Sequence, residues 1–174
     1  MDDMIRIAAV HDLSGFGKCS LSVALPVISA GGVECACLPT ALLSTHTGGF
    51  EGYTFKDLSE DMLPIARHWK REGVKFDGIY SGYLASAQQA KMLEEIIAEL
   101  KTNTTKIIVD PVMADNGHYY SSFDEQMCGA FRRLCAGADI ITPNITEAAF
   151  LTALPYHEAP HDARYLEQLM DGLS

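Results

Sequence analysis

The sequence predicts an α/β protein, with a mostly parallel sheet between layers of helices. Two observations lead to this class. Short apolar segments rich in β-branched residues alternate with segments whose apolar residues recur at helical spacing, along all 174 residues. No repeat, low-complexity tract or linker interrupts the alternation. Residues 1–174 are therefore expected to form a single domain.

The chain is acidic, and this argues against two classes of partner. Its formal net charge is −10, and its 13 Lys and Arg residues are scattered rather than clustered. Nucleic acid and anionic membranes are therefore not expected as partners. An anionic ligand would have to be held by backbone N–H groups, a helix N-terminus or a bound cation.

The cysteine content indicates a reducing compartment. The five cysteines form no Cys-x-x-Cys pair, and an odd number suits free thiols better than a disulfide framework. The acidic N-terminus leads directly into an apolar strand, so neither a signal peptide nor a membrane-spanning segment is predicted. We expect a cytoplasmic protein.

The first third of the chain begins with a strand and ends with a long loop. The strand is predicted for Met4 to Val10, and the turn His11 to Gly17 leads from it into a helical pattern from about Lys18 to Ala30. Val33 to Leu38 is a second apolar strand. The polar, Gly-rich segment Pro39 to Tyr53 is unusually long for a connection, which favours a binding loop or lid.

The middle of the chain contains a helix, a strand and a second helix. Apolar residues recur every three or four positions from Phe55, and this amphipathic helix ends at Gly73. The strand Phe76 to Tyr80 then ends in Ser81-Gly82-Tyr83. Ser86 and Gln89 are spaced as a capping box and start the next helix.

The last third repeats the alternation. Ile107 to Val109 is a short, buried parallel strand. A helix around Phe123 to Cys135 leads to a strand from Ala138 to Thr142. Two further helices are expected, one from Asn144 and one after Pro160.

Two carboxylates follow the strand Ile107 to Val109, and they mark a candidate site. Asp110 comes directly after the strand, and Asp115 follows in a loop that ends at Gly117. Ligands of open α/β sheets bind at the carboxyl ends of the strands, so a metal or phosphate site is one interpretation. An ordinary turn is the other, because Asp, Pro, Asn and Gly all favour turns.

A second polar pair opens the helix after Thr142. Asn144 and Glu147 lie three residues apart, on one face of the first turn. They would point toward Asp110 and Asp115 if the two strands are neighbours, and such oxygen ligands suit Mg²⁺ held partly through water. Alternatively, Asn144 caps the helix and Glu147 reaches back to it.

Two further segments could contact a small polar ligand. The turn after the first strand offers Asp12 and Ser14 beside glycines that allow close approach of the backbone. The long loop offers His46 and Thr47. A plain tight turn remains an alternative for the first segment.

Together these motifs closely resemble those of pyridoxal/pyridoxamine kinases of the ribokinase-like superfamily. The resemblance covers essentially the whole chain in order. It rests on His11-Asp12-Leu13-Ser14-Gly15-Phe16-Gly17, Ser44-Thr45-His46-Thr47-Gly48, Ser81-Gly82-Tyr83, Asp110-Pro111-Val112-Met113 with Asp115, and Ile141-Thr142-Pro143-Asn144 with Glu147.

The resemblance implies a ribokinase-like three-layer α/β/α fold and transfer of a phosphoryl group from ATP to the 5′-hydroxymethyl group of a B6 vitamer. Asp12 would contact the pyridine ring with Ser14 beside it, His46 and Thr47 would hold the ring from the loop, and Tyr83 would flank it. Hydroxymethylpyrimidine kinase chemistry is the alternative, because the Asp-Pro-Val-Met and Thr-Pro-Asn-x-x-Glu motifs are common to both kinds of kinase.

The remaining motif residues are implied to handle phosphates and ions. Asp110, Asp115, Thr142, Asn144 and Glu147 would lie near the nucleotide phosphates. Asp110, Asp115 and Glu147 would bind Mg²⁺, partly through water, and Thr142 would lie near the phosphates or a monovalent cation such as K⁺. A homodimer is expected for the full-length protein.

The sequence departs from the family pattern in two places. Ala114 stands where Gly is expected, before Asp115. The Gly-x-Gly-Asp motif, which supplies the catalytic base and an anion hole in this family, does not occur, and neither does the adenine-binding segment that follows it. We therefore expect the C-terminal portion of the domain to be absent and the 174-residue chain to be inactive, or a B6-binding protein without catalysis.

Overall fold

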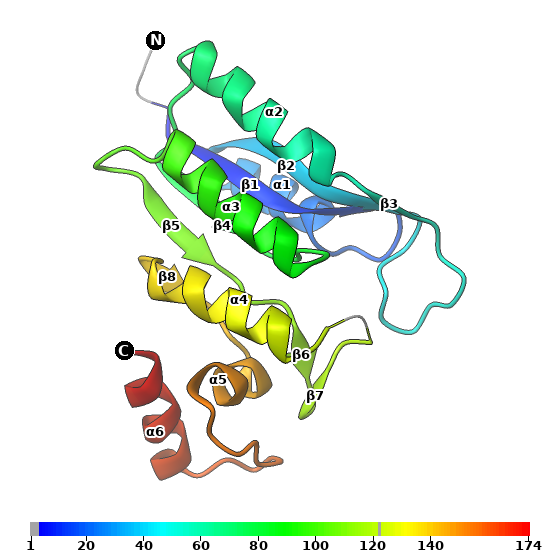
Figure 1. The fold of residues 1–174 in the computed structure, drawn as a ribbon, viewed down its shortest axis with the longest axis vertical. Helices are drawn as coiled ribbons and strands as arrows, with labels where there is room; N and C mark the ends of the chain where they lie inside the picture. Colours follow the sequence, from blue (N-terminus) through cyan, green and yellow to red (C-terminus); the bar gives the residue numbers. More distant parts are fainter. Residues whose placement is uncertain (1–3, 122) are drawn as a thin grey trace.

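A central sheet organises the molecule (Figure 1). The computed structural model describes residues 4–121 and 123–174, so the acidic residues 1–3 lie outside the described part. The strands are β1 (Arg6–Ser14), β2 (Glu34–Leu43), β3 (Phe55–Asp57), β4 (Gly78–Ser81), β5 (Lys106–Val109), β6 (Ala114–Asp115), β7 (His118–Tyr119) and β8 (Ile140–Ile141). The helices are α1 (Leu21–Ala30), α2 (Ser59–Arg71), α3 (Ala87–Leu100), α4 (Glu125–Ala136), α5 (Ile145–Thr152) and α6 (Ala163–Leu173).

The order of strands in the main sheet is β3-β2-β1-β4-β5-β8. Every neighbouring pair is parallel except β2 and β3. Helices α2, α3 and α4 lie on one face, and α1 lies behind the sheet in the same view (Figure 1). The predicted three-layer α/β/α fold with a mostly parallel sheet is therefore confirmed. Strands β5 and β8 pair in parallel, so the condition for Asn144 and Glu147 to point toward Asp110 is met.

The main core lies between the sheet and the helices α2, α3 and α4. Alternate residues of the parallel strands point into it, and each is followed by a residue on the opposite face. The strand residues on the core side are Ala8, Val10, Leu38, Ile79, Ile107 and Val109, and all of them are buried.

Strands β1 and β2 extend further than predicted. The sequence predicts that they end at Val10 and Leu38, but the ladder continues to the pair Ser14 and Leu43. The register shifts between His11 and Leu13, so Asp12 has no partner in the ladder. Such an irregularity re-aims a side chain, and here it belongs to a buried carboxylate.

The predicted helix from Phe55 begins later, at Ser59. Phe55 to Asp57 instead form β3, an antiparallel edge strand on β2. The backbone N–H of Ser59 donates to Oδ1 of Asp57 at 2.7 Å, which satisfies a free donor at the start of α2. The prediction that the helix includes Phe55 was therefore wrong, because the pairing of Phe55 with β2 outweighs its place in the helical period.

The predicted Gly-ended loop around Asp115 is a short hairpin. Strands β6 and β7 pair antiparallel through a turn in which Asn116 and Gly117 have φ of 50° and 78°. Positive φ at both central residues is typical of a type I′ turn, which Asn-Gly favours. The Asn-Gly pair was thus an available signal for this hairpin.

The predicted capping box of α3 is half correct. Ser86 accepts a hydrogen bond from the backbone N–H of Gln89 at 3.2 Å. The Gln89 side chain instead accepts from the backbone N–H of Ala85 and donates to the carbonyl of Thr40, at 2.8 and 2.9 Å. Gln89 is fully buried, and its hydrogen bond to Thr40 links α3 to β2.

Candidate active site

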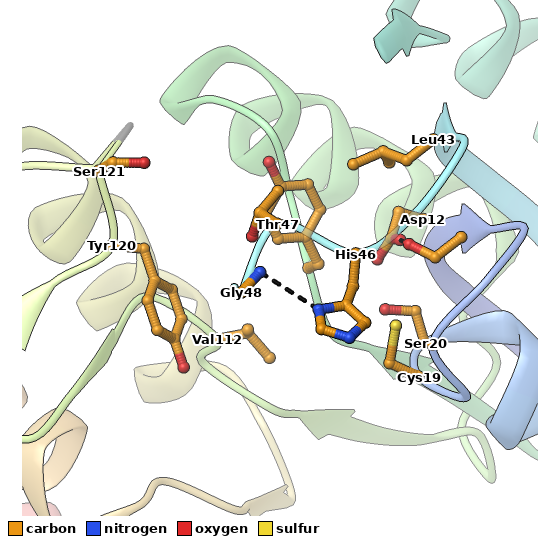
Figure 2. A pocket seen from close by; sticks show the side chains of 13 residues that line it. Asp12, Cys19, Ser20, Leu43, His46, Thr47, Gly48, Val112, Tyr120 and Ser121 are labelled. Atoms are coloured by element: carbon orange, nitrogen blue, oxygen red, sulfur yellow. Dashed lines mark hydrogen bonds between the residues drawn. The ribbon is translucent and has the colours of Figure 1, made fainter. Parts of the chain in front are cut away.

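A cavity of about 390 Å³ opens at the carboxyl ends of the parallel strands. Figure 2 shows its labelled side chains, which come from widely separated segments of the chain. All five residues predicted to bind substrate line it. The lining residues are Asp12, Ser14, Gly17, Cys19, Ser20, Leu43, His46, Thr47, Gly48, Tyr83, Val112, Tyr120 and Ser121.

Asp12 and Ser14 form a buried pair in this cavity. The Ser14 hydroxyl donates to Oδ2 of Asp12 at 2.7 Å, and the two residues are only 4% and 1% exposed. Within residues 4–121 and 123–174, no hydrogen bond to Asp12 Oδ1 is present. The pair therefore presents a fixed carboxylate with one oxygen free to accept a hydrogen bond.

His46 seats the long loop on the turn after β1. Its backbone N–H donates to the carbonyl of Phe16 at 3.2 Å, and its Nδ1 accepts from the backbone N–H of Gly48 at 3.2 Å (Figure 2). The ring lies so close to Gly17 that a Cβ there would overlap it. Gly17 also has φ of 122°, which glycine adopts readily. Glycine at position 17 thus permits close contact between the two loops.

A second cavity of about 400 Å³ adjoins the first, and the two share Cys19, Ser20, Tyr83 and Val112. It contains Asp110 together with His11, whose Nε2 is buried without a hydrogen-bond partner among the described residues. Burial lowers the pKa of His11 to about 4, so the imidazole is neutral near pH 7. Asp110 therefore lies next to the first cavity.

Asp110 lies close enough to Thr142 and Glu147 to interact with both. Burial raises the pKa of Asp110 to about 6, while a hydrogen bond with the Thr142 side chain opposes that rise. Burial also raises the pKa of Glu147 to about 7, and repulsion from Asp110 contributes. Clustered carboxylates with raised pKa values are typical of functional sites.

Asn144 and Glu147 form the capping box that the sequence left open as an alternative. Asn144 Oδ1 accepts from the backbone N–H of Glu147 at 3.0 Å, and Glu147 Oε2 accepts from that of Asn144 at 2.9 Å. Glu147 Oε1 accepts from the backbone N–H of Met113 at 3.1 Å. Both carboxylate oxygens of Glu147 are thus already hydrogen-bonded.

Asp115 lies beside the turn of the hairpin and makes its hydrogen bonds there. It is exposed, and its two oxygens accept from the backbone and side-chain nitrogens of Asn116, at 2.9 and 3.1 Å. In the described part of the chain, no three His, Cys, Asp or Glu side chains are grouped closely enough to hold a metal ion. Asp110, Asp115 and Glu147 therefore do not form an all-protein metal cage.

Tyr120 is a cavity residue that sequence reasoning missed. Burial raises the pKa of its hydroxyl, and the charges of Glu147, Asp115 and Asp110 raise it further. Tyr120 therefore lines the first cavity and lies within range of the charges of these carboxylates. The aromatic pair directly after the hairpin turn was the available signal, but it became informative only once the turn was known.

The fold is that of a ribokinase-like α/β protein, and it has a cavity of small-molecule size at the strand ends. The chain belongs to the phosphomethylpyrimidine kinase family, whose model matches residues 23–173. Across the described residues, no helix is both long and apolar enough to cross a membrane.

Several known proteins are similar to the chain. It is 32% identical over 165 residues to the pyridoxine/pyridoxal/pyridoxamine kinase of Bordetella avium, covering 86% of this chain and 52% of that protein. A structure of a Bacteroides thetaiotaomicron protein named as a phosphomethylpyrimidine kinase, in a crystal form with pyridoxal, is 42% identical. Its TM-score is 0.89, and the match covers 98% of this chain and 60% of that one.

The pyridoxal kinase structure from Lactobacillus plantarum is 37% identical, with a TM-score of 0.87 and coverage of 98% and 59%. The resemblance to pyridoxal kinases that the motifs predicted is therefore confirmed. The chain spans about half the length of the curated relatives it matches.

Proposed function

We propose that the chain forms the substrate-binding part of a kinase that transfers a phosphoryl group from ATP to the 5′-hydroxymethyl group of pyridoxal, pyridoxamine or pyridoxine. One observation carries the proposal: the predicted substrate residues, which come from three separate segments, line a single cavity of about 390 Å³. This volume suits a small ligand. The names of the Bordetella and Lactobacillus relatives support the same substrate class.

Each of the five predicted substrate residues has a proposed part in binding. Asp12 accepts a hydrogen bond from the pyridine ring or its substituents, and Ser14 holds the carboxylate in place. His46 and Thr47 close the cavity from the loop, and Tyr83 flanks the ring. Since phosphoryl transfer depends on positioning and charge neutralisation, such a rigid cavity supplies part of what the reaction needs.

The nucleotide phosphates are proposed to lie on the side of Asp110, with Thr142 and Asn144 nearby. The raised pKa of Asp110 indicates a carboxylate that a cation would stabilise. One protein carboxylate, phosphate oxygens and waters suit Mg²⁺, which would neutralise phosphate charge when bound. Asp110 fits direct contact, whereas Asp115 and Glu147 fit contact through water. A monovalent cation such as K⁺ near Thr142 remains part of the proposal.

Hydroxymethylpyrimidine kinase activity is the second candidate, because the description of the matching family favours it. One experiment distinguishes the two candidate activities. Calorimetry on the 174-residue chain compares its affinities for pyridoxal, pyridoxamine, pyridoxine and hydroxymethylpyrimidine. We expect a B6 vitamer to bind more tightly than the pyrimidine. Binding of the pyrimidine alone would overturn the B6 proposal. Asp12→Asn should weaken binding of the preferred vitamer.

The catalytic base is proposed to lie outside this sequence, in agreement with relatives about twice as long. The chain by itself should bind a vitamer weakly without phosphorylating it, and robust ATP-dependent turnover by residues 1–174 would contradict this. A B6-binding protein without catalysis is the alternative. Turnover by the natural protein that contains this chain would exclude that alternative.

A homodimer and a cytoplasmic location complete the proposal. Leu42 and Phe55 expose 45% and 44% of their surface at the edge formed by β2 and β3, which offers apolar surface for a second copy. All five cysteines are free, as suits a reducing compartment.

A further inference from the structure

Three side chains from the first turn of α5 hold the backbone of the β6–β7 hairpin. Asn144 Nδ2 donates to the carbonyl of Ala114 at 2.8 Å, and Glu147 Oε1 accepts from the backbone N–H of Met113 at 3.1 Å. Thr146 Oγ1 accepts from the backbone N–H of Gly117 at 3.0 Å. We call Asn144, Thr146 and Glu147 the α5 clamp.

Two of the three clamp residues are buried, whereas Asn144 at the start of the helix is exposed. Thr146 and Glu147 are each 2% exposed, and Ala114 is fully buried. The hairpin tip also lies close to the Tyr156 ring, since a Cβ at position 117 would come within 2.7 Å of Cδ1. The tip is therefore close to both α5 and the segment that follows it.

The hairpin leads at both ends into the wall of the substrate cavity. Val112 precedes it, and Tyr120 and Ser121 follow it. The backbone N–H of Tyr120 donates to the carbonyl of Met113 at 3.0 Å, next to the bond between Met113 and Glu147. In Figure 2, Val112, Tyr120 and Ser121 form the side of the cavity away from Asp12 and Ser20. A displacement of the hairpin would therefore move this wall.

We propose that the α5 clamp positions this wall of the substrate cavity, with Thr146 as a positioning residue alongside Asn144 and Glu147. The clamp acts through backbone hydrogen bonds, and Thr146 does not line either cavity. Only the choice of pyridoxal as probe rests on the proposed function. The clamp itself can be tested without any ligand.

The test uses two isosteric substitutions on the same helix. Thr146→Val removes the acceptor for Gly117. The matched control is Thr152→Val, because the Thr152 hydroxyl bonds only within α5, to the carbonyls of Ala148 and Ala149 at 2.8 and 3.2 Å. Hydrogen exchange of peptides from residues 112–121 is followed by mass spectrometry in the 174-residue chain.

We expect Thr146→Val to speed exchange in residues 112–121 about three- to tenfold, the scale for the loss of one hydrogen bond. Exchange in β1 and α3 should stay unchanged. Thr152→Val should not affect the hairpin, and Thr146→Ser, which keeps the hydroxyl, should restore wild-type exchange. Unchanged exchange at the hairpin, or an equal rise throughout the chain, would overturn the proposal.

Pyridoxal binding gives a second readout. Thr146→Val should weaken pyridoxal binding several-fold in calorimetry although residue 146 lies outside the cavity, and Thr152→Val should not. Wild-type affinity in Thr146→Val would refute the coupling to the cavity wall. If the wild-type chain binds no pyridoxal, the proposed substrate fails while the exchange experiment still decides the clamp.

Discussion

At the scale of single residues, Asp12 and Ser14 form a buried pair in the cavity, and we propose that it binds the substrate. Ser14→Ala leaves a carboxylate that is 4% exposed without its 2.7 Å partner. We expect a loss of about 1–2 kcal/mol in the free energy of unfolding, together with weaker pyridoxal binding. Urea denaturation and calorimetry measure both effects. Ser29→Ala, at an exposed position of α1 that lines neither cavity, is the control. Wild-type pyridoxal affinity in Ser14→Ala would refute a positioning role.

Asp110 gives a prediction about pH. Burial raises its pKa from 3.8 to about 6 in the folded chain, so the folded state binds the proton more tightly than the unfolded state. The associated stabilisation is present below about pH 4 and is lost as the pH rises through 6. A tenfold change in proton binding corresponds to about 1.4 kcal/mol. Between pH 4 and 7, the free energy of unfolding of wild type should therefore fall by roughly 1–3 kcal/mol relative to that of Asp110→Asn.

Urea denaturation across this pH range measures the difference. Asp171→Asn, at an exposed site on α6, should keep the wild-type pH dependence. Parallel curves for wild type and Asp110→Asn would show that the pKa of Asp110 is not raised.

At the scale of elements, the contact between the long loop and the turn after β1 depends on glycine. Gly17→Ala should displace the His46 ring and weaken pyridoxal binding at least tenfold, because the new Cβ would overlap the ring. Gly49→Ala is a matched control, since Gly49 also has positive φ, 77°, but a Cβ there would have no atom of the described residues within 4 Å. Gly49→Ala should lower the free energy of unfolding by only about 1 kcal/mol, the cost of positive φ in a residue other than glycine. Equal binding by the two variants would contradict the role of His46.

Local pattern predicted most elements but missed β3 and the hairpin. Phe55 fits a helical period, yet it pairs with Leu43 of β2, because a backbone ladder to a neighbouring strand outweighs one residue's periodicity. The Asn116-Gly117 turn carries a recognisable local signal, but its strands are only two residues long. Strands this short leave almost no alternation to detect.

At the scale of the whole molecule, α1 is the main cover over its face of the sheet and keeps apolar residues exposed. Val23, Leu25 and Val27 are 37%, 42% and 64% exposed, and Ile140 at the sheet edge is 51% exposed. We expect this surface to cause the 174-residue chain to self-associate and to bind an apolar dye. Val27→Glu, at a residue that also lines the second cavity, should reduce both, because a charge on this surface opposes its burial. Sedimentation velocity and dye fluorescence measure the two effects.

Gln126→Glu, which adds the same charge at an exposed position of α4, should leave both measurements unchanged. If Val27→Glu associates as wild type does, the exposed face of α1 is not the cause of association.

The sequence by itself determined the alternation of strands and helices, the three-layer class and the identity of the motif residues, because these depend on local periodicity and residue chemistry. Only the tertiary structure decided that Asp12, His46, Tyr83 and Tyr120 share one cavity. The tertiary structure also decided that both carboxylate oxygens of Glu147 accept hydrogen bonds from backbone N–H groups. Such facts depend on strand order, register and hydrogen-bond geometry between distant segments, which no local pattern encodes.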